Sequence, residues 1–211
     1  MITPIDDLKW RYAVDKFDPE KEVDPNIIDQ LCEAVRLAPS SYGLQPIKLL
    51  VITNRELRKE LVSYSYNQQQ VYDCSHLFIL CTHNILNEEL IEQHIARTAA
   101  ANQKLPQEYS KYCEFLKKNI LKMTYYEMKQ WNDKQAYIAL GHLLHTCAQL
   151  RVDSTPMEGF QKDMYDEILK LSEQNLHSVV LCPIGYRSKT DEQQFWPKIR
   201  KTKEEFVAFY S

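Results

Sequence analysis

The chain has 211 residues, of which 44% are hydrophobic and 26% are charged. These proportions fit a single globular domain over residues 1–211 and exclude a disordered or fibrous protein. Its 26 basic and 29 acidic residues give a net charge of −3 with both signs interspersed, which excludes a broad basic surface for nucleic acid or membranes.

The N-terminal segment has none of the features of a targeting signal. Residues 1–7 lack a basic stretch followed by an apolar one, and no apolar run in the chain approaches the roughly 20 residues of a membrane span. We therefore expect a cytoplasmic protein that makes no contact with membranes. A short first helix is expected ahead of Arg11.

The next expected helix has clear start and stop signals. Asp24 precedes Pro25, which is the pattern of a capping carboxylate with proline at the first helical position. Apolar residues recur at helical spacing over residues 27–35, and the helix should end near Leu37, because Ala38 precedes Pro39. Residues 39–46 then form a loop.

The middle of the chain alternates strands and helices. Residues 47–53 and 76–81 read as strands, Asn54 caps a short helix through residue 63, and residues 87–103 form another helix. Residues 108–123 look like a more polar helix that fits a flap. The pattern predicts an α+β fold with one small sheet and more helix than strand.

A long helix is predicted over residues 124–150. Its second half, residues 136–148, is apolar nearly all round, which is typical of a buried helix at the centre of a domain or of a dimer interface. Gly141 would permit close helix packing there. His142 and His145 could hold a metal, but no further ligand lies at useful spacing, so we expect core histidines and no metal.

A turn follows the long helix, and it is the most informative segment of the chain. It consists of Pro156, Met157, Glu158, Gly159 and Phe160. Proline stiffens the backbone and glycine allows close approach, so this turn suits the presentation of main-chain N–H groups to a flat, polar-edged ligand. A short helix over residues 162–171 and a strand over residues 178–186 complete the expected elements.

Glycine and cysteine positions exclude several kinds of site. The four glycines are too far apart for a Gly-x-Gly-x-x-Gly motif or a phosphate-binding loop. The six cysteines are widely separated and include no Cys-x-x-Cys, so neither a zinc site nor a disulfide framework is expected. Most of them lie in apolar stretches and should be buried thiols.

Five short segments in a fixed order carry a family resemblance. They are Arg11 near the start, Pro39-Ser40-Ser41 with Gln45-Pro46, Asn67 ahead of residues 73–76, the turn at residues 156–160, and Pro197-Lys198-x-Arg200. In this order the chain resembles the FMN-dependent nitroreductase family. Taken alone, Ser40 and Ser41 fit turn residues equally well, residues 67–70 fit a polar helix end, and the basic residues fit a solvated face.

The resemblance implies a nitroreductase-like fold with a central, mostly antiparallel sheet flanked by helices, a long buried central helix and an intertwined homodimer. It places FMN at the subunit interface and implies reduction by NADH or NADPH. It assigns the FMN phosphate to Arg11, Lys198 and Arg200, with Tyr12 and Ala13 beside them. The resemblance implies that Asn67 and Gln70 lie at the isoalloxazine edge and that Pro156 and Met157 pack under the ring. It assigns the backbone N–H groups of Glu158 and Gly159 to N5 and O4. From the partner subunit it adds Pro39, Ser40, Ser41 and Gln45.

The chain departs from the family pattern near the flavin N1 and O2 edge. Asp15 and Gln70 stand where relatives often carry lysine, and Ala13 stands where serine is common. Because reduced flavin carries negative charge near N1, the loss of two cations predicts a lower reduction potential than in relatives with both lysines.

The resemblance implies a ping-pong oxidoreductase, in which NAD(P)H passes hydride to flavin N5 and a nitroaromatic, quinone or similar flat acceptor then takes it. The alternative is a flavin-binding regulatory or storage protein without turnover. A third reading, a purely structural helical dimer, predicts a protein that retains no flavin.

Overall fold

A four-stranded antiparallel sheet forms the centre of the computed structural model, which describes residues 3–210. The first two residues of the N-terminal segment and the last residue of the expected domain therefore lie outside the described part. The strand order is β1-β2-β4-β3, with β1 at Ile47–Ile52, β2 at His76–His83, β3 at Asp153–Ser154 and β4 at Leu176–Gly185. The expected antiparallel sheet is confirmed.

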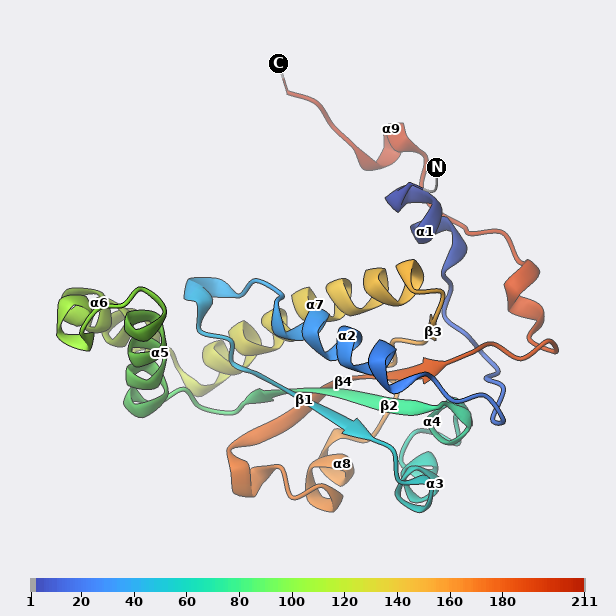
Figure 1. The fold of residues 1–211 in the computed structure, drawn as a ribbon, viewed down its shortest axis with the longest axis horizontal. Helices are drawn as coiled ribbons and strands as arrows, with labels where there is room; N and C mark the ends of the chain where they lie inside the picture. The colour runs from blue at the N-terminus through green and yellow to red at the C-terminus, as the bar shows by residue number, and fades with distance from the viewer. Residues whose placement is uncertain (1–2, 211) are drawn as a thin grey trace.

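Helices surround this sheet on both faces and at one end (Figure 1). They are α1 (Pro4–Trp10), α2 (Pro25–Arg36), α3 (Arg55–Ser63), α4 (Gln70–Asp73), α5 (Glu88–Ala101), α6 (Ser110–Ile120), α7 (Tyr125–Gln149), α8 (Lys162–Ile168) and α9 (Lys203–Phe206). Short 3-10 turns are η1 (Ser41–Gly43), η2 (Pro106–Tyr109), η3 (Ser172–Gln174) and η4 (Glu192–Phe195).

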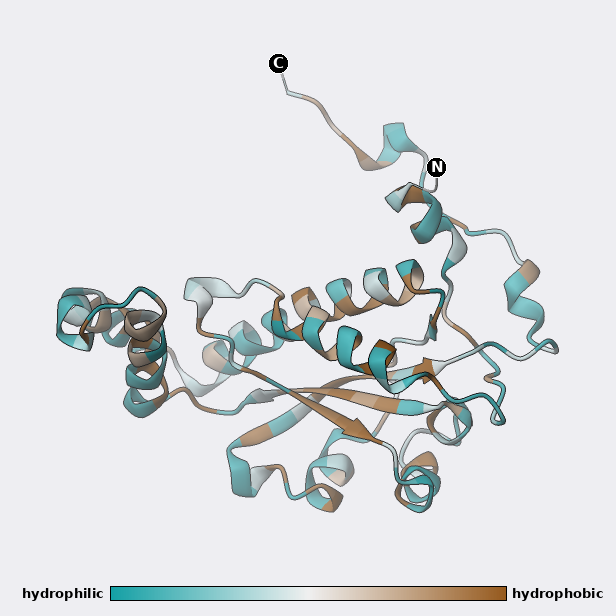
Figure 2. Cartoon of the chain, viewed as in Figure 1, coloured by the Kyte–Doolittle hydropathy of each residue, from teal (hydrophilic) through white to brown (hydrophobic). Residues whose placement is uncertain are grey.

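The sheet separates two layers of the core. In β2, Phe78 and Leu80 pack into the cluster under α2 and α7, whereas Leu77 and Ile79 pack into the cluster under α3 and α8. This is the alternation that a strand imposes on successive side chains. Figure 2 shows the hydrophobic colour concentrated on the strands, as expected for a sheet covered on both faces.

Helix boundaries follow the local capping chemistry. The side chain of Asp24 caps α2 by accepting from Asn26 N, and Thr124 forms a capping box with Glu127 at the start of α7. The helix expected over residues 108–123 is shorter than predicted, because the tight turn η2 ends at Tyr109 and α6 ends at Ile120.

In the isolated chain, α7 is buried on one side only. One side of its second half is buried against α2 and the sheet, at Ala136, Ala139, Leu140, Leu143 and Cys147. The opposite side is exposed: Tyr137 and Ile138 are 40% and 42% accessible, and Gly141 and His142 are also exposed. His142 is therefore not a core histidine, and His145 is only half-buried.

The C-terminal segment leaves the sheet as an arm that passes α1 (Figure 1). Its large apolar side chains are exposed, at Phe195, Trp196, Ile199, Phe206, Phe209 and Tyr210. Within residues 3–210, no helix has both the length and the apolar character that a membrane crossing requires.

Candidate functional site

Three cations from opposite ends of the chain line one surface cavity. Arg11, Lys198 and Arg200 lie around a hollow of about 330 Å³, together with Tyr12 and Ala13. The sequence separation is large, yet the structure brings the three predicted phosphate-binding side chains together. The same cavity is also lined by Gln193, Trp196, Pro197 and Ile199.

The cations in this hollow have no internal counter-charge. Within residues 3–210, no carboxylate lies at ion-pair distance from Arg11, Lys198 or Arg200. The Nε of Arg11 is buried and has no hydrogen-bond partner there. Burial lowers the pKa of Arg11 and of Lys198, and neighbouring cations lower both further. Uncompensated positive charge of this kind fits a bound dianion such as a phosphate monoester.

Asp191 joins the two ends of the chain beside this hollow. It is 1% exposed, and its Oδ2 accepts from the Tyr12 hydroxyl at 3.0 Å and from the backbone N–H groups of Asp15 and Lys16 at 2.9 and 3.2 Å. Its Oδ1 accepts from Gln193 N at 3.0 Å. Asp191 is not among the residues predicted from the sequence.

The turn at residues 156–160 presents two free backbone donors. Met157 N donates to Leu181 O at 2.8 Å, and Phe160 N donates to Glu158 O at 3.0 Å. No acceptor within residues 3–210 bonds the N–H groups of Glu158 and Gly159. These are the two groups that the sequence singled out as main-chain donors to a ligand, and they remain available to one.

Two side chains hold this turn. Tyr137 on α7 donates its hydroxyl to Glu158 Oε1 at 2.5 Å, and Gln68 donates its side-chain amide to Gly159 O at 2.7 Å. Burial raises the pKa of Tyr137, and the hydrogen bond to Glu158 raises it further. Neither residue was predicted. Tyr137 was placed in the apolar part of the helix, and nothing distinguishes Gln68 within the run of glutamines at residues 68–70.

Of the predicted flavin-edge residues, Asn67 lies on the turn before α4 and Gln70 is the first residue of α4. Asn67 is exposed and adopts a left-handed conformation with φ of 60°. Gln70 donates its side-chain amide to Asp15 Oδ1 at 3.0 Å. Thus Gln70 and Asp15, the two positions that lack the lysines of the family pattern, contact each other directly.

The loop of residues 39–45 is engaged in contacts of its own. Gln45 N donates to Ser40 Oγ at 2.9 Å, and Ser41 N donates to Gln135 Oε1 at 2.9 Å. In Figure 1 this loop lies beside α5 and α6, at the opposite end of the molecule from residues 187–200. One chain therefore does not bring Pro39, Ser40, Ser41 and Gln45 to the cation-lined hollow.

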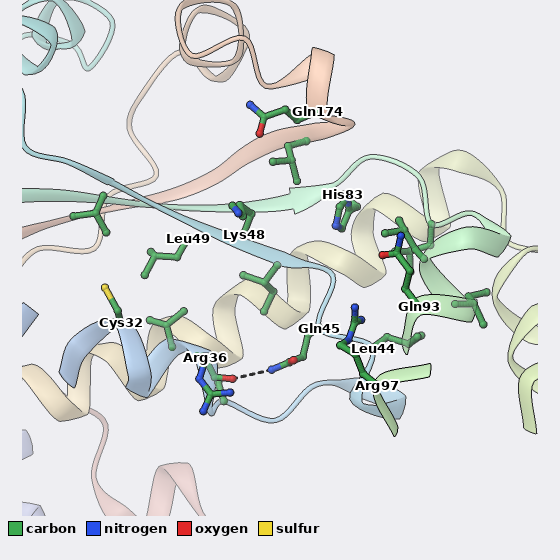
Figure 3. Close-up of a pocket in the computed structure, with 18 residues that line it drawn as sticks. Cys32, Arg36, Leu44, Gln45, Lys48, Leu49, His83, Gln93, Arg97 and Gln174 are labelled. Carbon is green, nitrogen blue, oxygen red and sulfur yellow. Dashed lines mark hydrogen bonds between the residues drawn. The ribbon is translucent and has the colours of Figure 1, made fainter. Parts of the chain in front are cut away.

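A second cavity lies elsewhere, between α2, β1 and α5, and measures about 720 Å³. Figure 3 shows Gln45 pointing toward Arg36, whose backbone oxygen accepts its side-chain amide at 2.7 Å. The cavity has an apolar floor and basic residues at Arg36, Lys48 and Arg97. It follows β1, which pairs only with β2 among residues 3–210, so it runs along a free sheet edge.

The cysteines form no site of their own. All six are free thiols, and Cys74, Cys81, Cys147 and Cys182 are buried, as expected. Burial raises the pKa of Cys147 to about 12, so this thiol remains protonated and unreactive. Residues 3–210 contain no cluster of three or more His, Cys, Asp or Glu side chains arranged to hold a metal.

Comparison with known proteins adds an independent finding. A sequence model of the nitroreductase family matches residues 8–186 of this chain. The Bacillus subtilis protein YfkO, provisionally named an NAD(P)H nitroreductase, is 32% identical over 214 residues, which cover 96% of this chain and 95% of YfkO. A Staphylococcus epidermidis relative with the same kind of provisional name is 29% identical over 215 residues, covering 98% of this chain and 96% of the relative.

Solved structures share the fold. A provisionally assigned NAD(P)H:FMN oxidoreductase from Staphylococcus epidermidis superposes with a TM-score of 0.87 at 18% identity, covering 100% of this chain and 97% of that protein. A provisionally assigned nitroreductase from Exiguobacterium sibiricum, solved in complex with FMN, superposes with a TM-score of 0.83 at 20% identity. The match covers 100% of this chain and 98% of that protein. The chain has a nitroreductase-like fold.

Proposed function

This chain belongs to the nitroreductase family, and from that premise we propose that it is an FMN-dependent oxidoreductase that uses NADH or NADPH as reductant. One observation carries the proposal: three uncompensated cations share a hollow at Arg11, Lys198 and Arg200, as a phosphate monoester requires. The two unpaired backbone donors at Glu158 and Gly159 supply what the polar edge of a flavin requires.

Different residues would hold different parts of the cofactor. Arg11, Lys198 and Arg200 would bind the phosphate through charge-assisted hydrogen bonds. Pro156 and Met157 would pack under the ring, and the N–H groups of Glu158 and Gly159 would donate to its N5 and O4 edge. Asn67 and Gln70 have amide groups that suit the alternating donors and acceptors of the pyrimidine edge.

When bound, FMN would supply the chemistry of hydride transfer between the nicotinamide and a nitroaromatic, quinone or similar flat acceptor. The chain's own residues would hold the ring in place and fix the direction of the Glu158 and Gly159 donors. Tyr137 and Asp191 would support these residues without contacting the reacting atoms.

We also propose an intertwined homodimer. The exposed side of α7 carries Tyr137, Ile138 and Gly141, and the C-terminal arm exposes Phe206 and Phe209. Exposed apolar side chains that gather on one element are typical of a protein–protein interface. A second copy would cover the α7 face and lay its arm along the free edge of β1, beside the 720 Å³ cavity. It would also bring its loop of residues 39–45 to the cofactor of the first copy.

The test is the flavin content and turnover of the purified protein. The proposal predicts a yellow protein that releases FMN on denaturation and turns over with NADH or NADPH in the presence of nitroaromatics, quinones or enones. A yellow protein without turnover would support the alternative of a flavin-binding regulatory or storage protein. A colourless protein that does not take up added FMN would overturn the proposal.

A further inference from the structure

Gln68 makes a two-point contact with the backbone near the turn at residues 156–160. Its Nε2 donates to Gly159 O at 2.7 Å and to Ser65 O at 3.0 Å. Both hydrogens of one amide group therefore bond to main-chain carbonyls from two separate segments. Gln68 is half-buried, so these bonds are partly shielded from water.

The segment that carries Gln68 is anchored in the core. Ser65 is fully buried, its hydroxyl donates to Leu61 O at 2.9 Å, and it lies 2.6 Å from the hydroxyl of Tyr165. A second link joins the two segments, because Gln161 N donates to Tyr64 O at 2.8 Å. The Gln68 amide thus fixes Gly159 relative to a segment that is itself anchored in the core.

Gly159 makes room for this contact. Its backbone is not in the left-handed region, so conformation alone does not demand glycine. A Cβ at this position would lie 3.1 Å from Gln68 Nε2 and 3.7 Å from the Tyr66 ring. The space that a side chain would fill is occupied by the Gln68 amide, and this explains the glycine in the Pro-x-Glu-Gly turn.

The turn before Gln68 is strained. Tyr66 and Asn67 adopt left-handed conformations with φ of 53° and 60°, which are unfavourable for residues other than glycine. Strain of this kind persists where the surroundings hold it in place. Here it places two adjacent side chains, Asn67 directed away from the core and Gln68 against Gly159.

We propose that Gln68 is a positioning residue for the Glu158 and Gly159 donors. It holds Gly159 from the carbonyl side, so that the two free N–H groups keep a fixed direction toward the N5 and O4 edge of the ring. It does so without contacting the cofactor. This inference rests on the proposed function, because it assigns to Gln68 the alignment of donors that FMN would use.

The test compares Gln68→Met, which keeps the side-chain length and removes the amide, with Gln69→Ala as control. Gln69 is an exposed glutamine one position along the chain. The readouts are the dissociation constant of FMN from the apoprotein and the dissociation constant of sulfite from the holoprotein. Sulfite adds to N5 and leaves negative charge on the ring, so its affinity reports the donors at that edge.

The loss of the Gln68 hydrogen bond to Gly159 O predicts roughly fivefold weaker sulfite binding in Gln68→Met, with wild-type values in Gln69→Ala. If Gln68→Met does not fold, Gln68→Asn keeps the amide on a shorter side chain and should also weaken sulfite binding. Sulfite affinity within twofold of wild type in the folded Gln68 variant would overturn the inference. A wild-type protein that does not bind FMN would instead overturn the proposed function, so the two failures are distinguishable.

Discussion

Gln70 donates a hydrogen bond to Asp15, with 3.0 Å between Nε2 and Oδ1. The two residues stand where the family pattern often has lysines, so a carboxylate and an amide replace two cations and bond to each other. Lys16 is the adjacent cation, but its side chain is exposed. The flavin edge at which negative charge accumulates on reduction would therefore face a carboxylate.

The first prediction is that Asp15→Lys raises the reduction potential of the bound flavin. Restoring a cation near N1 should favour the reduced form by about tenfold in equilibrium constant, which corresponds to roughly 1.4 kcal/mol. A redox titration against dyes of known potential measures this shift. Glu20→Lys is a matched control, since it makes the same charge change at an exposed position in the same segment. Equal potentials for wild type and Asp15→Lys would contradict the expectation.

The second prediction concerns the cation-lined hollow. Arg11→Gln, Lys198→Met and Arg200→Gln should each weaken FMN binding by roughly tenfold or more, because each removes a charge-assisted hydrogen bond. Binding of riboflavin, which lacks the phosphate, should change little. Lys201→Met is the control, because Lys201 is an exposed neighbour that does not line the hollow. If the variants lose equal affinity for FMN and for riboflavin, the phosphate does not bind in this hollow.

The third prediction concerns Gly141 on the exposed side of α7. A Cβ at this position would meet no atom within 4 Å in the isolated chain, and alanine favours a helix over glycine by about 1 kcal/mol. Gly141→Ala should therefore stabilise a monomer. If α7 is a dimer interface that needs close packing, the same change should raise the dimer dissociation constant. Sedimentation equilibrium measures the dimer dissociation constant of wild type and Gly141→Ala. An unchanged dissociation constant would mean that α7 does not form the interface.

The fourth prediction concerns pH. The pKa of Lys198 is lowered in the folded chain, first by burial and then by Arg11 and Arg200, so its charged form is disfavoured there. Between the lowered pKa and the ordinary value of 10.5, Lys198 therefore holds its proton more often in the unfolded chain than in the folded chain. In that pH range the free energy of unfolding of the apoprotein should rise with pH. Denaturant unfolding of wild type and Lys198→Met should show this rise only in wild type. The same slope in both proteins would mean that Lys198 carries no such penalty.

Much of the fold was predictable because its signals are local. The Asp24-Pro25 start of α2 depends on two adjacent residues and is confirmed, and the long helix predicted over residues 124–150 is confirmed as α7. The exposed side of α7 was not predicted, because an apolar helix face looks the same whether its own chain or a second copy covers it. The sequence pattern contains no information on which of the two applies.

The candidate site was predictable where chemistry requires a residue type. Arg11, Lys198 and Arg200 were assigned together from the family pattern, and the structure brings them into one hollow. Gln68 and Asp191 were missed, since their roles depend on contacts with segments 91 residues and about 175 residues away in sequence. Such contacts arise only when the chain is folded.

The most direct measurement is anaerobic mixing of the purified protein with NADH or NADPH, followed by addition of a nitroaromatic or quinone. The account predicts that the yellow flavin colour bleaches with one of the nicotinamides and returns when the acceptor is added. A flavin that stays yellow with both nicotinamides would contradict the central claim that this chain is an FMN-dependent oxidoreductase.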